Sequence, residues 1–342
     1  MKNMWMEVAT LVAVVPAVLS ASDRRPLGEI DFFGYKGVDL AAIRSALPFH
    51  EGDLFPPAKA KSSDDLKRQV SEKIKQVIGR APTDVSFVCC DSKQSFMVYI
   101  GLPGESYQAL AFNPAPVGDV RFPKAATALR EELEKAWANA VMKGHATEDD
   151  SEGFTLTNDP KARRAELAIR EYALRNEALI LQVLSSCSDA RHRAIAAQML
   201  GYGRQSDEQV DALVRASFDV DDGVRNDAVR ALEVLAGAKP SLAKRIPAEA
   251  FIRMLRSGAW SDHNKVSLLL VALTKGRDSK VLNLLRLEAL DPLVEMARWR
   301  NMGHAEAALS ILGRIAGFDE DSLDKLIEAG QADTIINKAN RQ

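Results

Sequence analysis

The chain has 342 residues, of which 46% are hydrophobic, 27% charged and 6% aromatic. This length exceeds one ordinary hydrophobic core, so we expect about two domains. The net charge of -2 and the pI of about 6.3 exclude a protein that binds nucleic acid through its overall charge, and no acidic tail is indicated. We therefore expect no nucleic-acid partner.

The first residues have the pattern of an export signal. Lys2 precedes an apolar run from Val8 to Leu19, and small residues follow it. As a helix this run would span about 18 Å, which is too short for a hydrocarbon core of about 30 Å. We predict a signal peptide over residues 1–21 and an exported protein, periplasmic or associated with the cell envelope. Because no clean cleavage site is present, a retained membrane anchor and an uncleaved helix of a cytoplasmic regulatory adaptor stay open as alternatives.

Residues 27–103 have the pattern of a small α/β domain. Apolar alternation indicates strands, and apolar stripes with the helical period indicate amphipathic helices. The expected order is strand, helix, helix, strand and strand, over residues 30–35, 38–47, 63–78, 84–90 and 95–101.

This order, with Gly34 after the first strand and residues 52–55 (Gly-Asp-Leu-Phe) after the first helix, resembles the POTRA domain of bacterial outer-membrane assembly and secretion proteins. The resemblance is confined to residues 27–103. It implies that the domain captures a peptide or strand at an exposed edge of its sheet. A similar small fold without that role is the alternative.

The chain has three cysteines. Cys89 and Cys90 are adjacent in the predicted strand 84–90, so their side chains are expected on opposite faces, which disfavours a disulfide between them. No Cys-x-x-Cys spacing indicates zinc. We interpret these two residues and Cys187 as small core side chains, with a bridge from Cys187 to one of the pair as the alternative.

Residues 104–160 are predicted to form a connector with one helix over residues 124–143. An irregular stretch with several prolines and short extended pieces precedes this helix. The acidic segment 148–153 is predicted to be a surface loop, and Pro160 is expected near the start of the next helix.

From residue 161 to the end, one helical motif recurs. Leu200, Leu232, Ala272 and Leu312 close its copies at steps of 32, 40 and 40 residues. The segments resemble HEAT repeats, most clearly over residues 221–232, and the C-terminal end resembles an armadillo repeat. The resemblance implies an all-α HEAT/armadillo-like α-solenoid over residues 161–342, after the α+β N-terminal domain.

Within the clearest copy of the motif, three charged residues occupy structural positions of the HEAT family. Asp221 and Asp222 precede the helix, where acidic side chains are favoured, and Arg225 follows them. We interpret them as helix caps and as a ladder between repeats.

The sequence carries no motif of an enzyme. It lacks a phosphate loop, a dinucleotide fingerprint and a nucleophile elbow, and its five histidines form no His-x-x-x-His pair. We therefore expect no catalytic, cofactor-binding or metal residue, and we predict a non-enzymatic scaffold or adaptor for a protein partner. The alternative is an enzyme of the HEAT-like lyase or glycosylase type, which would need converging charged side chains with shifted pKa values in the solenoid groove.

The predicted inner helices carry more basic than acidic residues. The basic ones are Arg191, Arg193, Arg204, Arg230, Lys265, Lys275, Arg300 and Arg314. Such a face could attract an acidic segment of a protein partner, although a solvated charged face gives the same pattern. The four residues that we predict to bind the partner are Arg193, Arg230, Lys265 and Arg314.

Overall fold

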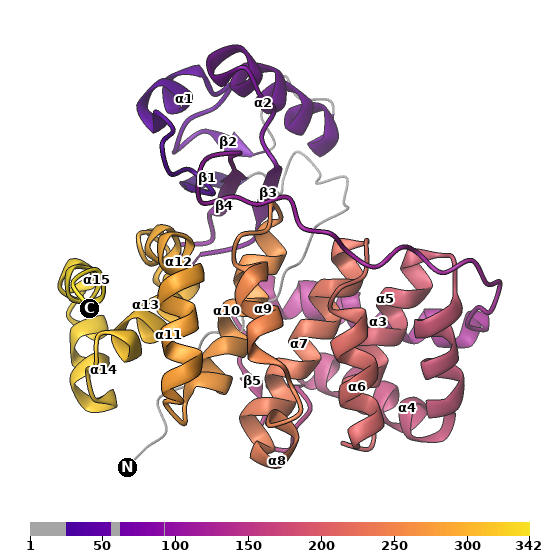
Figure 1. Cartoon of the computed structure of the whole chain (residues 1–342). Coiled ribbons are helices and arrows are strands. Elements are labelled where there is room, and N and C mark those ends of the chain that lie inside the picture. Colours follow the sequence, from indigo (N-terminus) through magenta and orange to yellow (C-terminus); the bar gives the residue numbers. More distant parts are fainter. Residues whose placement is uncertain (1–24, 56–61, 92) are drawn as a thin grey trace. The chain divides into compact units, whose positions relative to one another are not determined.

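The computed structural model describes residues 25–55, 62–91 and 93–342 (Figure 1). They form two compact units. The first unit comprises Ala111–Met254 and Asn264–Leu284, and the second comprises the described residues up to Leu110 together with Leu255–His263 and Leu285–Gln342. The predicted signal peptide lies outside the described residues. Within the described ranges, no helix is both long enough and apolar enough to cross a bilayer.

The second unit is built on a four-stranded sheet with the strand order β2-β1-β4-β3. Its strands are β1 (Arg25–Phe33), β2 (Leu54–Phe55), β3 (Asp84–Val88) and β4 (Phe96–Gly101). β4 runs parallel to β1 and antiparallel to β3, and β2 is antiparallel to β1. The predicted order of strand, helix, helix, strand and strand is confirmed, with the short β2 added to it.

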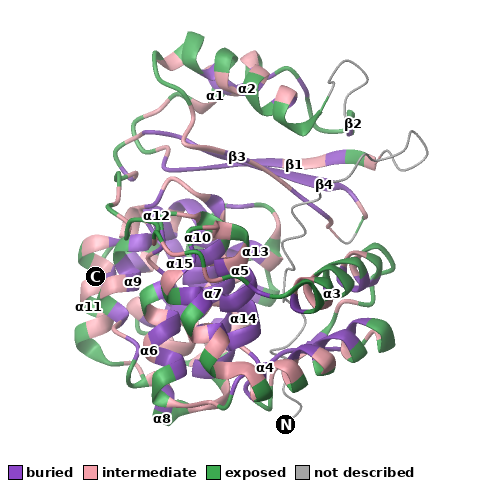
Figure 2. Ribbon diagram, turned by 90° about the vertical axis from the view of Figure 1, so that its right-hand side faces the viewer, coloured by how far each residue is buried: buried purple, intermediate pink, exposed green. Residues whose placement is uncertain are grey.

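Two helices cover one face of this sheet, α1 (Leu40–Ala46) and α2 (Ser63–Ile78), as Figure 2 shows. Asp39 caps α1 by accepting two backbone N–H groups, and Ser62 caps α2 in the same way with one. Alternate residues of β4 enter one core with the apolar stripe of α2. This core includes Phe96, Val98 and Ile100 from the strand and Leu66, Val70 and Ile74 from the helix.

Residues from the C-terminal part of the chain cover the other face of the same sheet. α12 (Leu290–Ala297) packs against β1, and α13 (Met302–Ile315) supplies His304. The ring of Tyr99 lies 5.0 Å from the rings of Trp260 and Trp299, and its hydroxyl forms a hydrogen bond with Nδ1 of His304. Trp299 also donates its ring N–H to the carbonyl of Phe32 at 2.9 Å. Both faces of the sheet are therefore buried.

Glu295 of α12 fixes the loop that follows β1. Its carboxylate accepts the backbone N–H groups of Gly34 at 2.7 Å and Tyr35 at 3.0 Å, and the hydroxyl of Ser106 at 2.6 Å. Burial raises the pKa of Glu295, while these donors favour its ionised form. A side chain at Gly34, whose φ is +67°, would collide with the carbonyl oxygen of Leu102. These bonds tie α12 to the α/β region within one compact unit.

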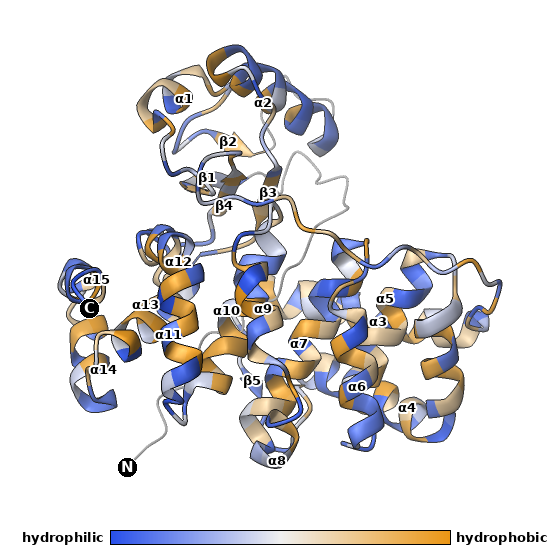
Figure 3. Cartoon of the chain, viewed as in Figure 1, coloured by the Kyte–Doolittle hydropathy of each residue, from blue (hydrophilic) through white to orange (hydrophobic). Residues whose placement is uncertain are grey.

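The first unit consists mainly of antiparallel helices. They are α3 (Lys124–Met142), α4 (Pro160–Ser186), α5 (Ala190–Leu200), α6 (Asp207–Ala216), α7 (Asp222–Ala238), α8 (Pro240–Ala243) and α9 (Ala248–Met254). α5 packs against α4 and α7, and α5 and α7 are largely buried (Figure 2). In Figure 3 hydrophobic and hydrophilic residues are interspersed along the helices, as amphipathic helices require. The predicted helix 124–143 is confirmed.

The fold contains four further helices. α10 (Trp260–Thr274) and α11 (Ser279–Glu288) each have residues in both compact units, and α14 (Glu320–Glu328) and α15 (Ala332–Ala339) belong to the second. The chain is thus an α+β protein with a small sheet near its N-terminus and helices through most of the rest. That level of the predicted fold class is confirmed.

Two buried arginines repeat one arrangement at an interval of 32 residues. Nη1 of Arg193 donates to the carbonyls six and five residues earlier, and Nη1 of Arg225 does the same at distances of 2.9–3.1 Å. Arg193 also forms a two-bond ion pair with Asp219, in the turn before α7. Asp221 accepts the N–H of Val224 and so caps α7. The interpretation of Asp221 as a helix cap is confirmed, whereas the ladder between repeats stays a prediction.

The predicted irregular connector forms an extended strap, residues 111–122, along the turns of the first unit. Asn113 donates its backbone N–H to the carbonyl of Phe218, and Gly118 pairs with the backbone of Ser186 and Ser188. A side chain at Gly118 would approach the carbonyl oxygen of Ser186 to 2.5 Å, so glycine permits this close pairing.

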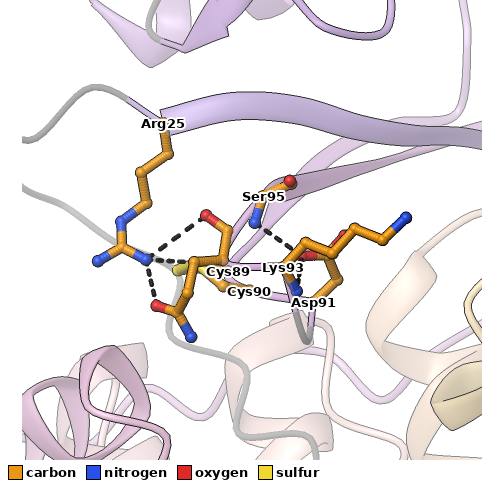
Figure 4. Close-up of a disulfide and its surroundings, with 7 residues drawn as sticks. Arg25, Cys89, Cys90, Asp91, Lys93 and Ser95 are labelled. Atoms are coloured by element: carbon orange, nitrogen blue, oxygen red, sulfur yellow. Dashed lines mark hydrogen bonds between the residues drawn. A yellow bond between two sulfur atoms is a disulfide. The ribbon is translucent and has the colours of Figure 1, made fainter.

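Cys89 and Cys90 form a disulfide, so the prediction that they stand on opposite faces of a strand is wrong (Figure 4). β3 ends at Val88, and the alternation of side chains along a strand does not extend to the two cysteines. Arg25 lies beside the pair and donates to the carbonyl of Gln94 at 3.4 Å. Cys187 is buried and carries no disulfide, as predicted.

Replacing Arg193 should strongly destabilise the first unit. Arg193→Met leaves the buried Asp219 without its guanidinium, which typically costs about 3–5 kcal/mol. Arg191→Ala is the matched control, because it removes only an exposed ion pair with Glu131 and should cost about 0.2–1 kcal/mol. Urea denaturation measures both free energies of unfolding, and equal losses in the two variants would contradict the ladder.

Candidate functional site

The predicted basic face is largely neutralised within the protein. Six of its eight residues form ion pairs with carboxylates: Arg191 with Glu131, Arg193 with Asp219, Arg204 with Glu177, Arg230 with Glu148, Arg300 with Glu51, and Arg314 with Glu320. A face of paired charges attracts an acidic segment far less than a face of free cations.

Two of the four predicted partner-binding residues lie away from the protein surface. Arg193 and Arg314 are buried, with side chains only 1% and 3% exposed, and Arg314 belongs to the second unit. Arg230 and Lys265 do lie near each other in the first unit, since their charges interact. Binding of an acidic partner through the four remains a prediction.

Two buried histidines, His263 and His304, have contacts within the protein. Nε2 of His263 lies 2.7 Å from the carbonyl of Ser257, and His304 bonds with Tyr99. In the described part of the chain, no group of three His, Cys, Asp or Glu side chains could hold a metal ion.

A cluster of buried and half-buried charges lies in the first unit, and we call it the charge cluster. It comprises Glu148, Asp150, Tyr202, Arg230, Glu233 and Lys265. Arg230 and Glu233 come from α7, Lys265 from α10, and Tyr202 from the turn after α5, while Glu148 lies in the hairpin strand β5 (Figure 1). Residues far apart in the sequence thus form one site.

The hairpin that carries Glu148 is held in place by a buried carboxylate. β5 (Glu148–Asp149) pairs with β6 (Leu156–Thr157). Glu166 of α4 accepts the backbone N–H of Thr157 at 2.6 Å and the ring N–H of Trp137 at 2.7 Å. These bonds join the hairpin to α3 and α4, so Glu148 is positioned by ordered structure.

Three oxygens of the charge cluster are buried without a hydrogen-bond partner among the described residues. They are Oε2 of Glu148, Oδ1 of Asp150 and the hydroxyl of Tyr202. The other carboxylate oxygen of Glu148 accepts a hydrogen bond from Arg230. Glu148 and Tyr202 are each only 4% exposed, whereas Asp150 and Glu233 are half-buried. Buried polar groups without partners are costly, and such groups often mark a functional position.

The environment shifts the pKa values of the cluster. Burial, with the Asp150 carboxylate adding to it, raises the pKa of Glu233 to about 7. Burial and the nearby Arg230 lower the pKa of Lys265 to about 8. Burial raises the pKa of Glu148, although the guanidinium of Arg230 opposes this shift. Two groups therefore titrate near neutral pH in one place, which is frequent at functional sites.

The ionised cluster has an excess of negative charge. Glu148, Asp150 and Glu233 supply three carboxylates against the two cations Arg230 and Lys265. The neighbouring Asp227 is already paired with Arg130 at 2.8 Å. The arrangement can therefore accept hydrogen bonds and a positive charge more readily than an anion.

Most of this site has no counterpart in the sequence-based expectations. The prediction of a surface loop over residues 148–153 is wrong for Glu148, which is buried in β5. The signal for the hairpin is weak, because it depends on Gly153 and on a return strand of only two residues. Tyr202 and Glu233 have no local pattern that would distinguish them from ordinary helix and turn residues.

Comparison with protein-family models and with curated proteins finds no match. Among solved structures, the chain is similar to an engineered protein of the Northeast Structural Genomics Consortium. The two are 16% identical, and the alignment covers 64% of this chain and 95% of the other with a TM-score of 0.36. A likeness at this level supports no inference about function.

Asp150→Asn should raise the free energy of unfolding, and more at pH 8 than at pH 5. The raised pKa of Glu233 means that its contribution to stability is present below about pH 4.5 and is lost as the pH rises through about 7. Without the Asp150 charge, Glu233 ionises more easily, so the free energy of unfolding at pH 8 should be higher by about 1 kcal/mol. Urea denaturation at both pH values measures the difference.

Asp149→Asn is the matched control for this measurement. Asp149 accepts the N–H and hydroxyl of Ser151, so its substitution should lower stability slightly and equally at both pH values. A loss of stability in Asp150→Asn, or a gain that does not depend on pH, would show that Asp150 does not destabilise the cluster.

Proposed function

We propose that the protein is a non-enzymatic interaction scaffold or adaptor whose helical pairs are HEAT/armadillo-like repeats of an α-solenoid. The observation that carries this proposal is the repeated arginine arrangement of Arg193 and Arg225 at an interval of 32 residues. Equivalent bonds at equivalent turns are the property of a repeated unit. Stacks of such units commonly hold other macromolecules on an extended surface.

The partner is proposed to be a protein. The prediction of an acidic segment depends on free basic side chains, but Arg193, Arg230 and Arg314 are paired with Asp219, Glu148 and Glu320. An acidic segment of the partner would therefore have to compete with these carboxylates for the three arginines.

The location in a bacterial cell envelope stays a proposal that rests on residues 1–21. A POTRA-like role for residues 27–103 is likewise proposed, supported by the strand order and by the short edge strand β2. Under this proposal a partner strand would add to the sheet edge. N-terminal sequencing of the mature protein separates a cleaved, exported chain from a cytoplasmic one.

Site-specific photo-crosslinking tests the scaffold without disturbing the fold. A photoreactive residue replaces Val117, which is 93% exposed in the strap of the first unit, or Leu54, which is 54% exposed in β2. In cells that produce the full chain, we expect one discrete adduct from position 117 that untagged protein competes away. An adduct from position 54 alone would assign capture to the sheet edge, and no discrete adduct at either position would contradict the scaffold.

An enzyme is a second candidate function. It requires converging charged side chains with shifted pKa values, and the charge cluster has them. Glu233 and Lys265 have pKa values of about 7 and about 8, close to those of working acids and bases. Mass spectrometry of the captured partner distinguishes the two candidates. A scaffold returns it unchanged, whereas an enzyme would alter its mass in a way that Glu233→Gln abolishes.

A further inference from the structure

We propose that the charge cluster binds an alkyl guanidinium or alkyl ammonium group, a cation that donates several N–H hydrogen bonds. The group could belong to a free small molecule or to an arginine or lysine side chain of a protein partner. The site does not depend on the scaffold proposal, because a free cation could occupy it in either case.

The unpartnered atoms of the cluster determine the kind of ligand. Oε2 of Glu148 and Oδ1 of Asp150 are carboxylate oxygens that can only accept when ionised, and the hydroxyl of Tyr202 can accept as well. A ligand that satisfies them must therefore present several donors. Guanidinium and ammonium groups have donors and no acceptor.

Tyr202 distinguishes this site from a chance group of acidic residues. Its side chain is 4% exposed, its hydroxyl has no partner in the described structure, and the charges of Glu148, Asp150 and Arg230 act on it. A buried hydroxyl that only packed in a core would normally find a partner. Its position points to a ligand that approaches the carboxylates.

The net charge of the cluster favours the same ligand. With three carboxylates and two cations, a bound monocation would bring the total to zero. Asp150 and Glu233 are half-buried, so the cluster is partly exposed to solvent at these two residues. A charge-assisted hydrogen bond at such a partly dehydrated position is stronger than one in water.

Calorimetric titration of the full chain with ethylguanidinium, a free alkyl guanidinium with a single charge, tests the site. We expect binding that is about fivefold to tenfold tighter at pH 8 than at pH 6. Guanidinium stays charged throughout, whereas the pKa of Glu233 is about 7 and that of Lys265 about 8. Loss of both protons makes the site more negative. Glu148, Asp150, Arg230 and Asp227 also face these two groups.

Variants that should keep the fold identify the atoms involved. Tyr202→Phe should weaken binding about fivefold and Asp150→Asn about tenfold, because each changes an oxygen that has no hydrogen-bond partner among the described residues. Asp149→Asn, whose carboxylate bonds with Ser151, should leave the affinity unchanged. Equal affinity in Tyr202→Phe, Asp150→Asn and the wild type would overturn the proposal.

A short peptide with a single arginine, capped at both ends, forms the second arm. Binding of the peptide alone assigns the site to a protein side chain, and binding of both probes assigns it to the cation itself. If neither probe binds, the proposal fails. If the chain binds ethylguanidinium but gives no cross-linked adduct, the cation site is supported and the scaffold is contradicted. If an adduct forms but ethylguanidinium and the peptide do not bind, only the cation site is contradicted.

Discussion

A guanidinium buried against the carbonyls of a turn is the interaction on which the first unit depends. The turn between two helices leaves backbone carbonyls that the helices cannot satisfy. Arg193 donates to two of them and, through Asp219, also holds the following turn. Because α5 packs against α7, this buried polar contact helps to fix the position of α5 relative to the turn before α7.

Glu295 and the charge cluster illustrate two ways to bury a carboxylate. Glu295 has donors for both of its oxygens, so the energetic cost of burying it is offset by the loop that it holds. Glu148 has a donor for one oxygen only, and Asp150 adds like charge beside it. The first arrangement supports structure. The arrangement at Glu148 and Asp150 lowers stability unless a bound group donates hydrogen bonds to their unpartnered oxygens.

Local signals in the sequence predict the helices and strands well, because capping residues, apolar periods and glycine stops act over a few residues. α2 begins and ends where Ser62 and Gly79 indicate. The same signals could not predict that Trp299 and His304 cover the sheet, since these contacts span about 200 residues or more. The charge cluster escapes prediction for the same reason, as its side chains meet only after folding. The disulfide could not be predicted because the strand pattern extends to Cys90, whereas β3 ends at Val88.

The strap pairs with two turns of the helical part and so depends on the spacing between them. Asn113 pairs with Asp219 and Gly118 with Cys187, so five strap residues match an interval of 32 residues in the helical part. The two directions are opposed, since the strap advances while the helical positions go back along the chain. A single inserted residue between these two points would put the strap out of step with the turns. The connector thus limits how the spacing of the helical pairs can change, although it is irregular in itself.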